Sequence, residues 1–258
     1  MALDLIDIPK QEAMSPVNLS DQALDSFFSV ALAWIREQGF DMDIDTNMRN
    51  WASFVENALA NDGANPAFNP DASGPHHDAF WVNLTFGGRT VATMAQRRID
   101  CEEGYYEFLR SGRLWGNRIN PIDILIRHPG VQGRVGHSGG LYVHPDFRRL
   151  GLSWYLPRVV QARAILEWGL SFIGSTHFEV LSKVGIVKNY GFQSKQLIVD
   201  GYFWPTGKNE RIYAADFPAS FIVERAVKDL ASIAKNSNKQ VRDLAPVVRK
   251  RKAETAVG

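Results

Sequence analysis

The stretch Val143-His-Pro-Asp-Phe-Arg-Arg-Leu-Gly-Leu-Ser153 joins two segments whose patterns predict different secondary structure. Residues 137–143, His-Ser-Gly-Gly-Leu-Tyr-Val, are typical of a strand, and residues 154–168 carry apolar side chains at helical spacing. The connection between them therefore ends at a helix N-terminus, where the first backbone amides have no partner inside the helix. Because the positive end of the helix dipole lies at the same place, this connection is suited to binding an anion.

Three residues strengthen that interpretation. Gly151 allows close approach of a ligand to the backbone, and Arg148 and Arg149 add positive charge and hydrogen-bond donors. The same features also occur in an ordinary strand-to-helix connection that carries a surface arginine pair. Local features alone leave both interpretations open.

The order of the residues resembles a known pattern. V-x-P-x-x-R-x-x-G-x-S closely resembles the acyl-CoA loop of the GCN5-related N-acetyltransferases, through Val143, Pro145, Arg148 and Gly151. Ser153 stands where that family prefers Gly or Ala, a mild departure because serine is small. Downstream, residues 188–192, Lys-Asn-Tyr-Gly-Phe, resemble the family's helix that ends in a Gly-Phe pair after the second parallel strand.

The resemblance implies an α/β (α+β) fold with a central mixed β-sheet flanked by helices. It implies transfer of an acetyl or other acyl group from acyl-CoA, as co-substrate and without a metal, to an amine by direct attack. Cofactor binding would fall to the end of the strand and to the loop, namely to Leu141, Tyr142, Val143, Arg148, Arg149, Leu150, Gly151, Leu152 and Ser153. The acceptor, a small molecule or a peptide, cannot be inferred, because one fold serves many acceptors.

Two catalytic candidates lie on the same strand. His137 is eleven residues before Arg148 (148 − 137 = 11), where some family members carry a general-base glutamate, and histidine titrates near neutral pH. The alternative for His137 is a strand-end histidine bonded to a loop carbonyl. Tyr142 alternates with Leu141 and Val143, so it either points into an acceptor cleft or is buried under a helix.

Two departures from the family pattern favour an alternative function. Val187 stands where the family often has the tyrosine that protonates the leaving thiolate, and Tyr190 is expected to serve aromatic packing instead. Pro157 falls in the first turns of the expected helix, where it removes a backbone donor. The alternative is a non-catalytic module that binds CoA or a protein partner.

Composition sets wider bounds. With 258 residues of which 45% are hydrophobic, the chain can bury one core with a small accessory region. Lys and Arg number 29 against 28 Asp and Glu, so no strong overall field favours nucleic acid or an anionic membrane. The single cysteine, Cys101, cannot form an internal disulfide, and no export signal or bilayer-length apolar run is evident, which predicts a cytoplasmic protein without a membrane partner.

The expected organisation has three parts: N-terminal helices and a loop packed on the core over 1–78, an acyltransferase-like core over 79–235 with an insertion at about 101–136, and a basic tail over 236–258. The insertion is either a lid or a structural helix on the sheet. The tail carries Arg249-Lys-Arg-Lys252, which is either solvated or a contact for nucleic acid. The oligomeric state cannot be predicted.

The periodicities predict the remaining elements. They are helices over 20–38 (with Ser20 as N-cap), 46–59, 179–190 and 221–233, a hairpin of 80–86 and 89–95, and strands over 170–177, 194–203 and 211–214. Residues 61–78 are rich in Gly and Pro and predict a loop, in which His76 and His77 are expected to be solvated rather than metal ligands.

Overall fold

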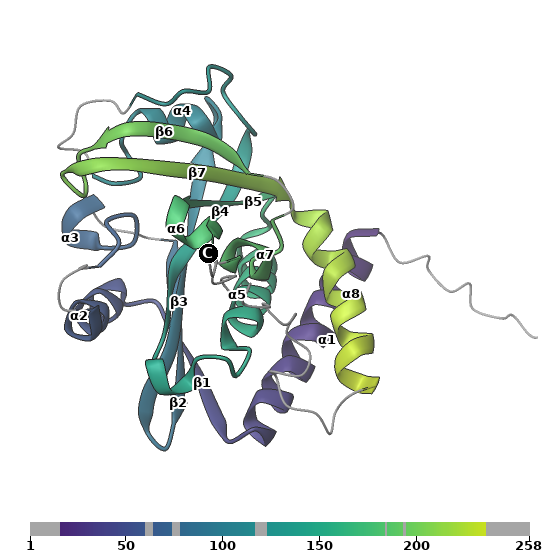
Figure 1. Cartoon of the computed structure of the whole chain (residues 1–258). Coiled ribbons are helices and arrows are strands. Elements are labelled where there is room, and N and C mark those ends of the chain that lie inside the picture. The colour runs from purple at the N-terminus through teal and green to yellow at the C-terminus, as the bar shows by residue number, and fades with distance from the viewer. Residues whose placement is uncertain are drawn as a thin grey trace, which may run out of the picture.

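The protein is built around a seven-stranded mixed sheet with helices on both faces (Figure 1). The computed structural model describes residues 16–59, 64–73, 78–116, 123–183, 185–192 and 195–235. The strands are β1 Phe40–Asp45, β2 Ala79–Phe86, β3 Arg89–Cys101, β4 Gly133–Val143, β5 Phe172–Phe178, β6 Gln196–Phe203 and β7 Lys208–Pro218, in the order β1-β2-β3-β4-β5-β7-β6. Only β4 and β5 are parallel, so the expected α/β fold with a mixed sheet is confirmed.

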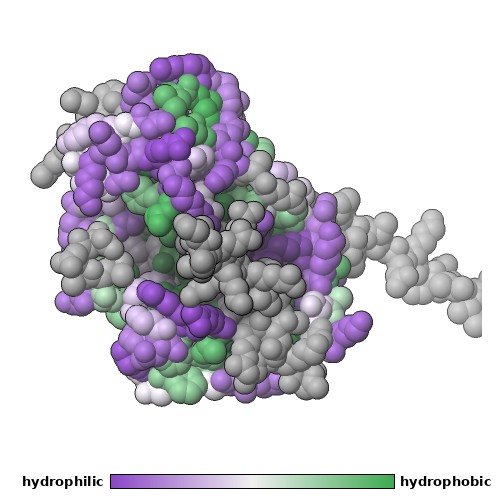
Figure 2. Space-filling model, viewed as in Figure 1, coloured by the Kyte–Doolittle hydropathy of each residue, from purple (hydrophilic) through white to green (hydrophobic). Residues whose placement is uncertain are grey.

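Two hydrophobic cores lie on the two faces of the sheet. The helices are α1 Pro16–Glu37, α2 Met48–Leu59, α3 Pro70–Ser73, α4 Tyr105–Arg110, α5 Leu152–Trp168, α6 Glu179–Lys183, α7 Ile186–Asn189 and α8 Ala219–Lys235. α1, α5, α7 and α8 contribute to one core, and α2 and α4 contribute to the other. On the outside, hydrophilic residues cover much of the described surface in the view of Figure 2.

The sequence reading missed one strand. Phe40-Asp-Met-Asp-Ile-Asp45 forms β1, which pairs antiparallel with β2 and buries Phe40 and Met42. Its strict alternation of apolar and acidic residues is the period-two pattern of a half-buried strand. The region expected to hold only helices and a loop, 1–78, therefore also contributes to the sheet.

Several boundaries also differ from expectation. β3 continues to Cys101, past the expected end at 95, and β7 covers Lys208–Pro218 rather than 211–214. Ser20 lies inside α1 rather than at its N-cap. The expected helix over 179–190 is two short helices, because Gly185 adopts a left-handed conformation (φ +77°) between them. β4 begins at Gly133, four residues before the expected start.

The insertion at 101–136 is packed structure in the part that is described. Tyr105, Tyr106 and Leu109 of α4 are buried, and the amides of Tyr105 and Tyr106 donate to the carbonyls of Val131 and Pro129. Among the two alternatives, this arrangement favours a structural helix over a lid.

Of the loop expected over 61–78, the described residues 64–73 are less exposed than their composition indicates, since Phe68 is fully buried, and Pro70–Ser73 form the short helix α3 instead of loop. His76, His77 and the basic cluster Arg249–Lys252 lie outside the described residues. Within the described ranges, no helix combines the length and apolar content needed to cross a membrane.

Candidate functional site

The site begins where β4 and β5 separate. The two strands pair over three residues only, from Val135–Phe172 to His137–Gly174. Beyond that point β5 continues to pair with β7, while β4 pairs with β3. In the described part of the chain, the β4 edge from Ser138 to Val143 therefore has no strand partner on its β5 side. Its outward backbone groups can pair with an extended ligand.

A bulge marks the same half of β4. The β3–β4 register shifts between Thr93 and Ala95, opposite Gly139–Tyr142. Gly140 has φ +62°, and a Cβ there would lie 2.5 Å from the Trp51 ring, so only glycine fits. β4 therefore bulges at Gly140.

The loop after β4 presents backbone amides. Pro145–Phe147 form one 3₁₀ turn, and α5 then begins after Gly151, which is left-handed (φ 82°, ψ 4°). Arg149 has φ +71°, the one positive value at a non-glycine among the described residues. Such strained residues cluster at functional sites, and left-handed residues in a turn form concavities that bind anions.

The amides of Arg149 to Ser153 fit an anion by their hydrogen bonding and charge. Within the described residues, none of them donates a backbone hydrogen bond. The first turn of the 17-residue α5 contains no acidic residue, and Arg148 and Arg149 are exposed beside it. Arg148 Nε lies 3.4 Å from the carbonyl of Val143. The loop thus offers an anion unpaired backbone amides and positive charge.

The Gly-Phe motif packs against this loop. Asn189 Nδ2 donates to Ser153 Oγ at 3.1 Å. Gly191 has φ +92°, and a Cβ there would collide with Nη1 of Arg225 from α8. The glycine of this motif is therefore required both by backbone conformation and by the approach of a buried guanidinium.

His137 does not have the environment expected of a general base. It is 1% exposed, its Nδ1 lies 2.7 Å from Tyr105 Oη, and its ring stacks on Phe68 at 5.4 Å between centroids. Burial, with a smaller effect of Arg97, lowers the pKa of His137 to about 3. These contacts favour a packing role, in place of either the predicted base or the alternative bond to a loop carbonyl.

Tyr142 is half-buried and meets Phe54 of α2 edge-on, with ring centroids 5.6 Å apart. The structure thus places it between the two predicted alternatives, neither fully buried nor fully open. Leu141 and Val143 are also half-buried.

Neither Val187 nor Tyr190 supplies the missing acid. Val187 is buried, and Tyr190 is buried with its ring stacked against Phe192. Burial raises the pKa of Tyr190 above its ordinary value, so this phenol is a poor proton donor. The packing role predicted for Tyr190 is confirmed.

His177 lies at the end of β5, past the point where β4 and β5 separate. It stacks on Tyr213, and its Nε2 is buried with no hydrogen-bond partner among the described residues. Burial, and to a smaller extent Lys195, lowers the pKa of His177 to about 4. His177 is therefore neutral at physiological pH.

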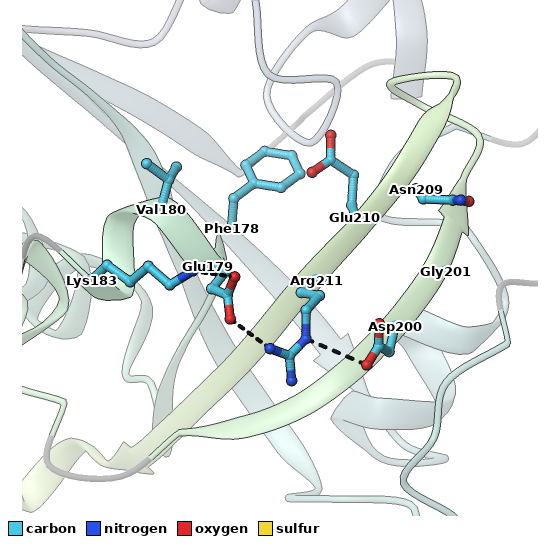
Figure 3. A pocket seen from close by; sticks show the side chains of 9 residues that line it. All are labelled: Phe178, Glu179, Val180, Lys183, Asp200, Gly201, Asn209, Glu210 and Arg211. Carbon is cyan, nitrogen blue, oxygen red and sulfur yellow. Dashed lines mark hydrogen bonds and ion pairs between the residues drawn. The ribbon is translucent and has the colours of Figure 1, made fainter.

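A pocket of about 500 Å³ lies between α6 and the β6–β7 hairpin (Figure 3). It is lined by Phe178, Glu179, Val180, Lys183, Asp200, Gly201, Asn209, Glu210 and Arg211. Because β4 and β5 are parallel, the end of β5 that borders this pocket lies at the same edge of the sheet as the 143–153 loop. From the sequence, Glu179 is only a reserve candidate for the base, and the pocket itself is not predicted, since no local pattern brings a hairpin and a separate helix together.

The pocket is charged. Glu179 accepts from Lys183 and Arg211, each at 2.7 Å, and Arg211 Nε also lies 3.4 Å from Asp200 (Figure 3). Lys183 and Arg211 lower the pKa of Glu179. With Glu210, the lining holds three carboxylates and two cations. Within the described residues, no cluster of three or more His, Cys, Asp or Glu has the arrangement of a metal site.

No protein-family model and no curated protein matches this chain. Solved structures of acetyltransferases are similar to it. Arabidopsis thaliana NAA60 in complex with acetyl-CoA is 10% identical, with 69% of this chain and 98% of that chain covered and a TM-score of 0.46. The ribosomal-protein-S18-alanine N-acetyltransferase from Escherichia coli is 13% identical, with 70% and 94% covered and a TM-score of 0.44. Spermidine N-acetyltransferase from Vibrio cholerae is 9% identical, with 73% and 98% covered and a TM-score of 0.47. These solved structures are GCN5-related acetyltransferases, the family whose acyl-CoA loop resembles Val143–Ser153, but at this level of similarity they carry no argument about activity.

Proposed function

We propose that this protein is an acyltransferase that moves an acetyl or other acyl group from acyl-CoA to an amine. One observation carries the proposal: an open strand edge, Ser138–Val143, leads directly into a loop whose amides from Arg149 to Ser153 have no backbone acceptor in the described residues. An extended chain with amide groups followed by a diphosphate matches this order of donors. Pantetheine linked to a pyrophosphate has that chemistry.

Each part of the site has a separate role. The amides of Arg149–Ser153 and the dipole of α5 would bind the pyrophosphate, and Arg148 and Arg149 would add charge. The β4 edge at Leu141–Val143 would bind and orient the pantetheine, which places the thioester beside the bulge at Gly140. The thioester supplies the activated acyl group. Backbone amides near Leu141 would donate to its oxygen as charge develops.

An ammonium must lose its proton before it attacks the thioester. Tyr142 stays our catalytic candidate on β4 as a residue of the acceptor cleft, and not as the base, because it is half-buried at the open edge. His137 is not proposed as the base, because its ring is enclosed by Phe68 and Tyr105.

The direct test has two steps. Isothermal titration with acetyl-CoA is expected to show binding, and S-acetylpantetheine, which keeps the thioester but lacks the pyrophosphate and the nucleoside, is expected to bind far more weakly. Thiol release is then followed over primary amines such as spermidine, an aminoglycoside and a peptide with an N-terminal alanine. Failure to bind acetyl-CoA at millimolar concentration would refute the proposal.

For the acceptor, we propose a cationic amine bound in the pocket of Figure 3. Arg211 and Lys183 are already paired with Glu179 and Asp200, which leaves Glu210 to attract an ammonium group. Glu210→Gln is expected to raise the acceptor KM while the acetyl-CoA dissociation constant is unchanged. Lys208→Gln, on the same hairpin but outside the pocket lining, is the control. Equal kinetics of the two variants would remove the pocket from acceptor binding.

A second candidate function is a module that binds CoA without turnover. The observation that favours it is that Val187 has no proton to donate and that Tyr190 and His137 are buried, so none of these three residues is placed to act as acid or base. Acetyl-CoA binding without thiol release across the amine panel would support this alternative over the enzyme.

A further inference from the structure

A buried ion network joins α8 to α5. Arg158 Nε of α5 pairs with Asp229 of α8 at 3.0 Å, and Arg225 Nε lies 3.9 Å from the same carboxylate. The three side chains are 10–13% exposed. The network thus lies in the interior, where lost contacts are not replaced by water.

The two guanidinium groups extend the network to α7. Arg158 Nη1 donates to the carbonyls of Trp154 and Asn189, both at 2.9 Å. Arg225 Nη1 donates to the carbonyl of Tyr190 at 3.0 Å, and its Nη2 donates to Gln161. The two arginines therefore bind the carbonyls at the end of α7, which is only four residues long and cannot be stable by itself.

The last contact reaches the anion loop. Asn189 Nδ2 donates to Ser153 Oγ, and Ser153 lies in the first turn of α5. A continuous path of hydrogen bonds therefore runs from Asp229 through Arg158 and Asn189 to Ser153. In addition, the Arg158 guanidinium stacks over the Trp154 ring at 4.0 Å, in the same first turn.

The charges of the network explain why the Asp229 carboxylate is needed to hold the two arginines. One carboxylate faces two guanidinium groups, so removal of Asp229 would leave two buried cations without an anion. Burial and the neighbouring Arg158 lower the pKa of Arg225 to about 9. Asp229 thus holds both arginines in the orientation in which they bind the α7 carbonyls.

We propose that Arg158 and Asp229 are positioning residues for the acyl-CoA loop: α8, through Asp229 and Arg158, fixes Asn189 and Ser153 and so orients the amides at the start of α5. This inference rests on the proposed function for its ligand. α8 follows the last strand and does not touch the cofactor site. Through Asp229 and Arg158 it would nevertheless fix the geometry of that site.

Arg158→Lys tests the proposal, because lysine keeps the charge but cannot make the same forked set of bonds. Arg163→Lys is the matched control, since Arg163 lies on the same helix and pairs only with Glu167 at the surface. Arg158→Lys is expected to raise the acetyl-CoA dissociation constant by about tenfold, the order of effect of a small misplacement at a site. Arg163→Lys is expected to leave it unchanged.

Hydrogen exchange of the free protein separates the two proposals. Without ligand, Arg158→Lys should speed exchange at residues 149–155 and 186–192 relative to β2 and β3. Wild-type protein that fails to bind acetyl-CoA would refute the proposed function, while the exchange pattern would still decide the positioning role. A lower melting temperature with unchanged exchange in these segments and an unchanged dissociation constant would overturn the inference.

Asn189→Ala covers the case in which Arg158→Lys does not fold. It leaves the Arg158–Asp229 pair intact and removes only the bond to Ser153. Faster exchange confined to residues 149–155 supports the path through Asn189, and wild-type exchange there overturns it.

Discussion

The two halves of β4 differ in what lies beside them. From Val135 to His137 the strand is paired on both sides, and its side chains are buried. From Ser138 to Val143 it pairs with β3 alone and bulges at Gly140, and its last residues are half-buried. One strand thus serves first as core and then as a binding edge.

The difference between the two halves explains why His137 can be structural although it stands at a position that is catalytic in some members of the family. His137 is the last residue of the paired half, and it is enclosed by Phe68 from one side and Tyr105 from another. Tyr142 lies on the open half and keeps partial exposure. Function is therefore expected after the point of separation rather than before it.

The largest effect is expected on the paired half. Phe68→Ala removes a fully buried ring that stacks on His137 and should cost about 3–5 kcal/mol of unfolding free energy. Urea denaturation measures the loss. A loss below about 1 kcal/mol would show that Phe68 is not a core residue.

The hydrogen bond between Tyr105 and His137 should show itself in a double-mutant cycle. His137→Phe and Tyr105→Phe each leave one buried polar group without a partner, at a cost of about 1–3 kcal/mol. The double variant removes both groups and should recover much of that loss. If His137 is structural, the double variant keeps its turnover. Turnover that is abolished in a stable double variant would restore His137 as the base.

His137 should also make stability depend on pH. Its folded pKa of about 3 lies below the value of about 6.5 for an unperturbed histidine, so below pH 6.5 the unfolded state binds a proton that the folded state does not. This contribution to stability is present above pH 6.5 and falls by about 1.4 kcal/mol per pH unit toward pH 3. His177 acts in the same direction down to about pH 4. Between pH 6 and pH 4, the unfolding free energy of the double variant should fall less steeply than that of the wild type. Identical slopes would show that His137 is exposed in the folded protein and has the pKa of an ordinary histidine.

Sequence could predict the open half of the site and not the paired half. The Val143–Ser153 loop is local: its strand, turn glycine and helix start lie within one short segment, and its geometry follows from that order. The environment of His137 depends on Tyr105, 32 residues earlier, and on Phe68 from a loop. The ion pair that joins α5 to α8 links Arg158 and Asp229, which are 71 residues apart in the sequence. Neither a periodicity nor a motif predicts such contacts. In contrast, β1 could have been predicted, because its apolar and acidic residues alternate.

The smallest effect is expected on the open half. Arg148 is exposed beside the loop, and its Nε approaches only the carbonyl of Val143. Arg148→Ala should therefore leave stability within about 0.5 kcal/mol of wild type. It should weaken acetyl-CoA binding by about 5–10-fold, since a charge-assisted contact to phosphate is lost, and the effect should shrink at high salt. Titration at two ionic strengths measures both. Arg134→Ala is the control, because Arg134 precedes the paired half of β4 and donates to the carbonyl of Trp168, at the opposite end of α5. If both variants bind acetyl-CoA equally well, the loop does not hold the phosphates, and the division of β4 into core and binding edge loses its functional meaning.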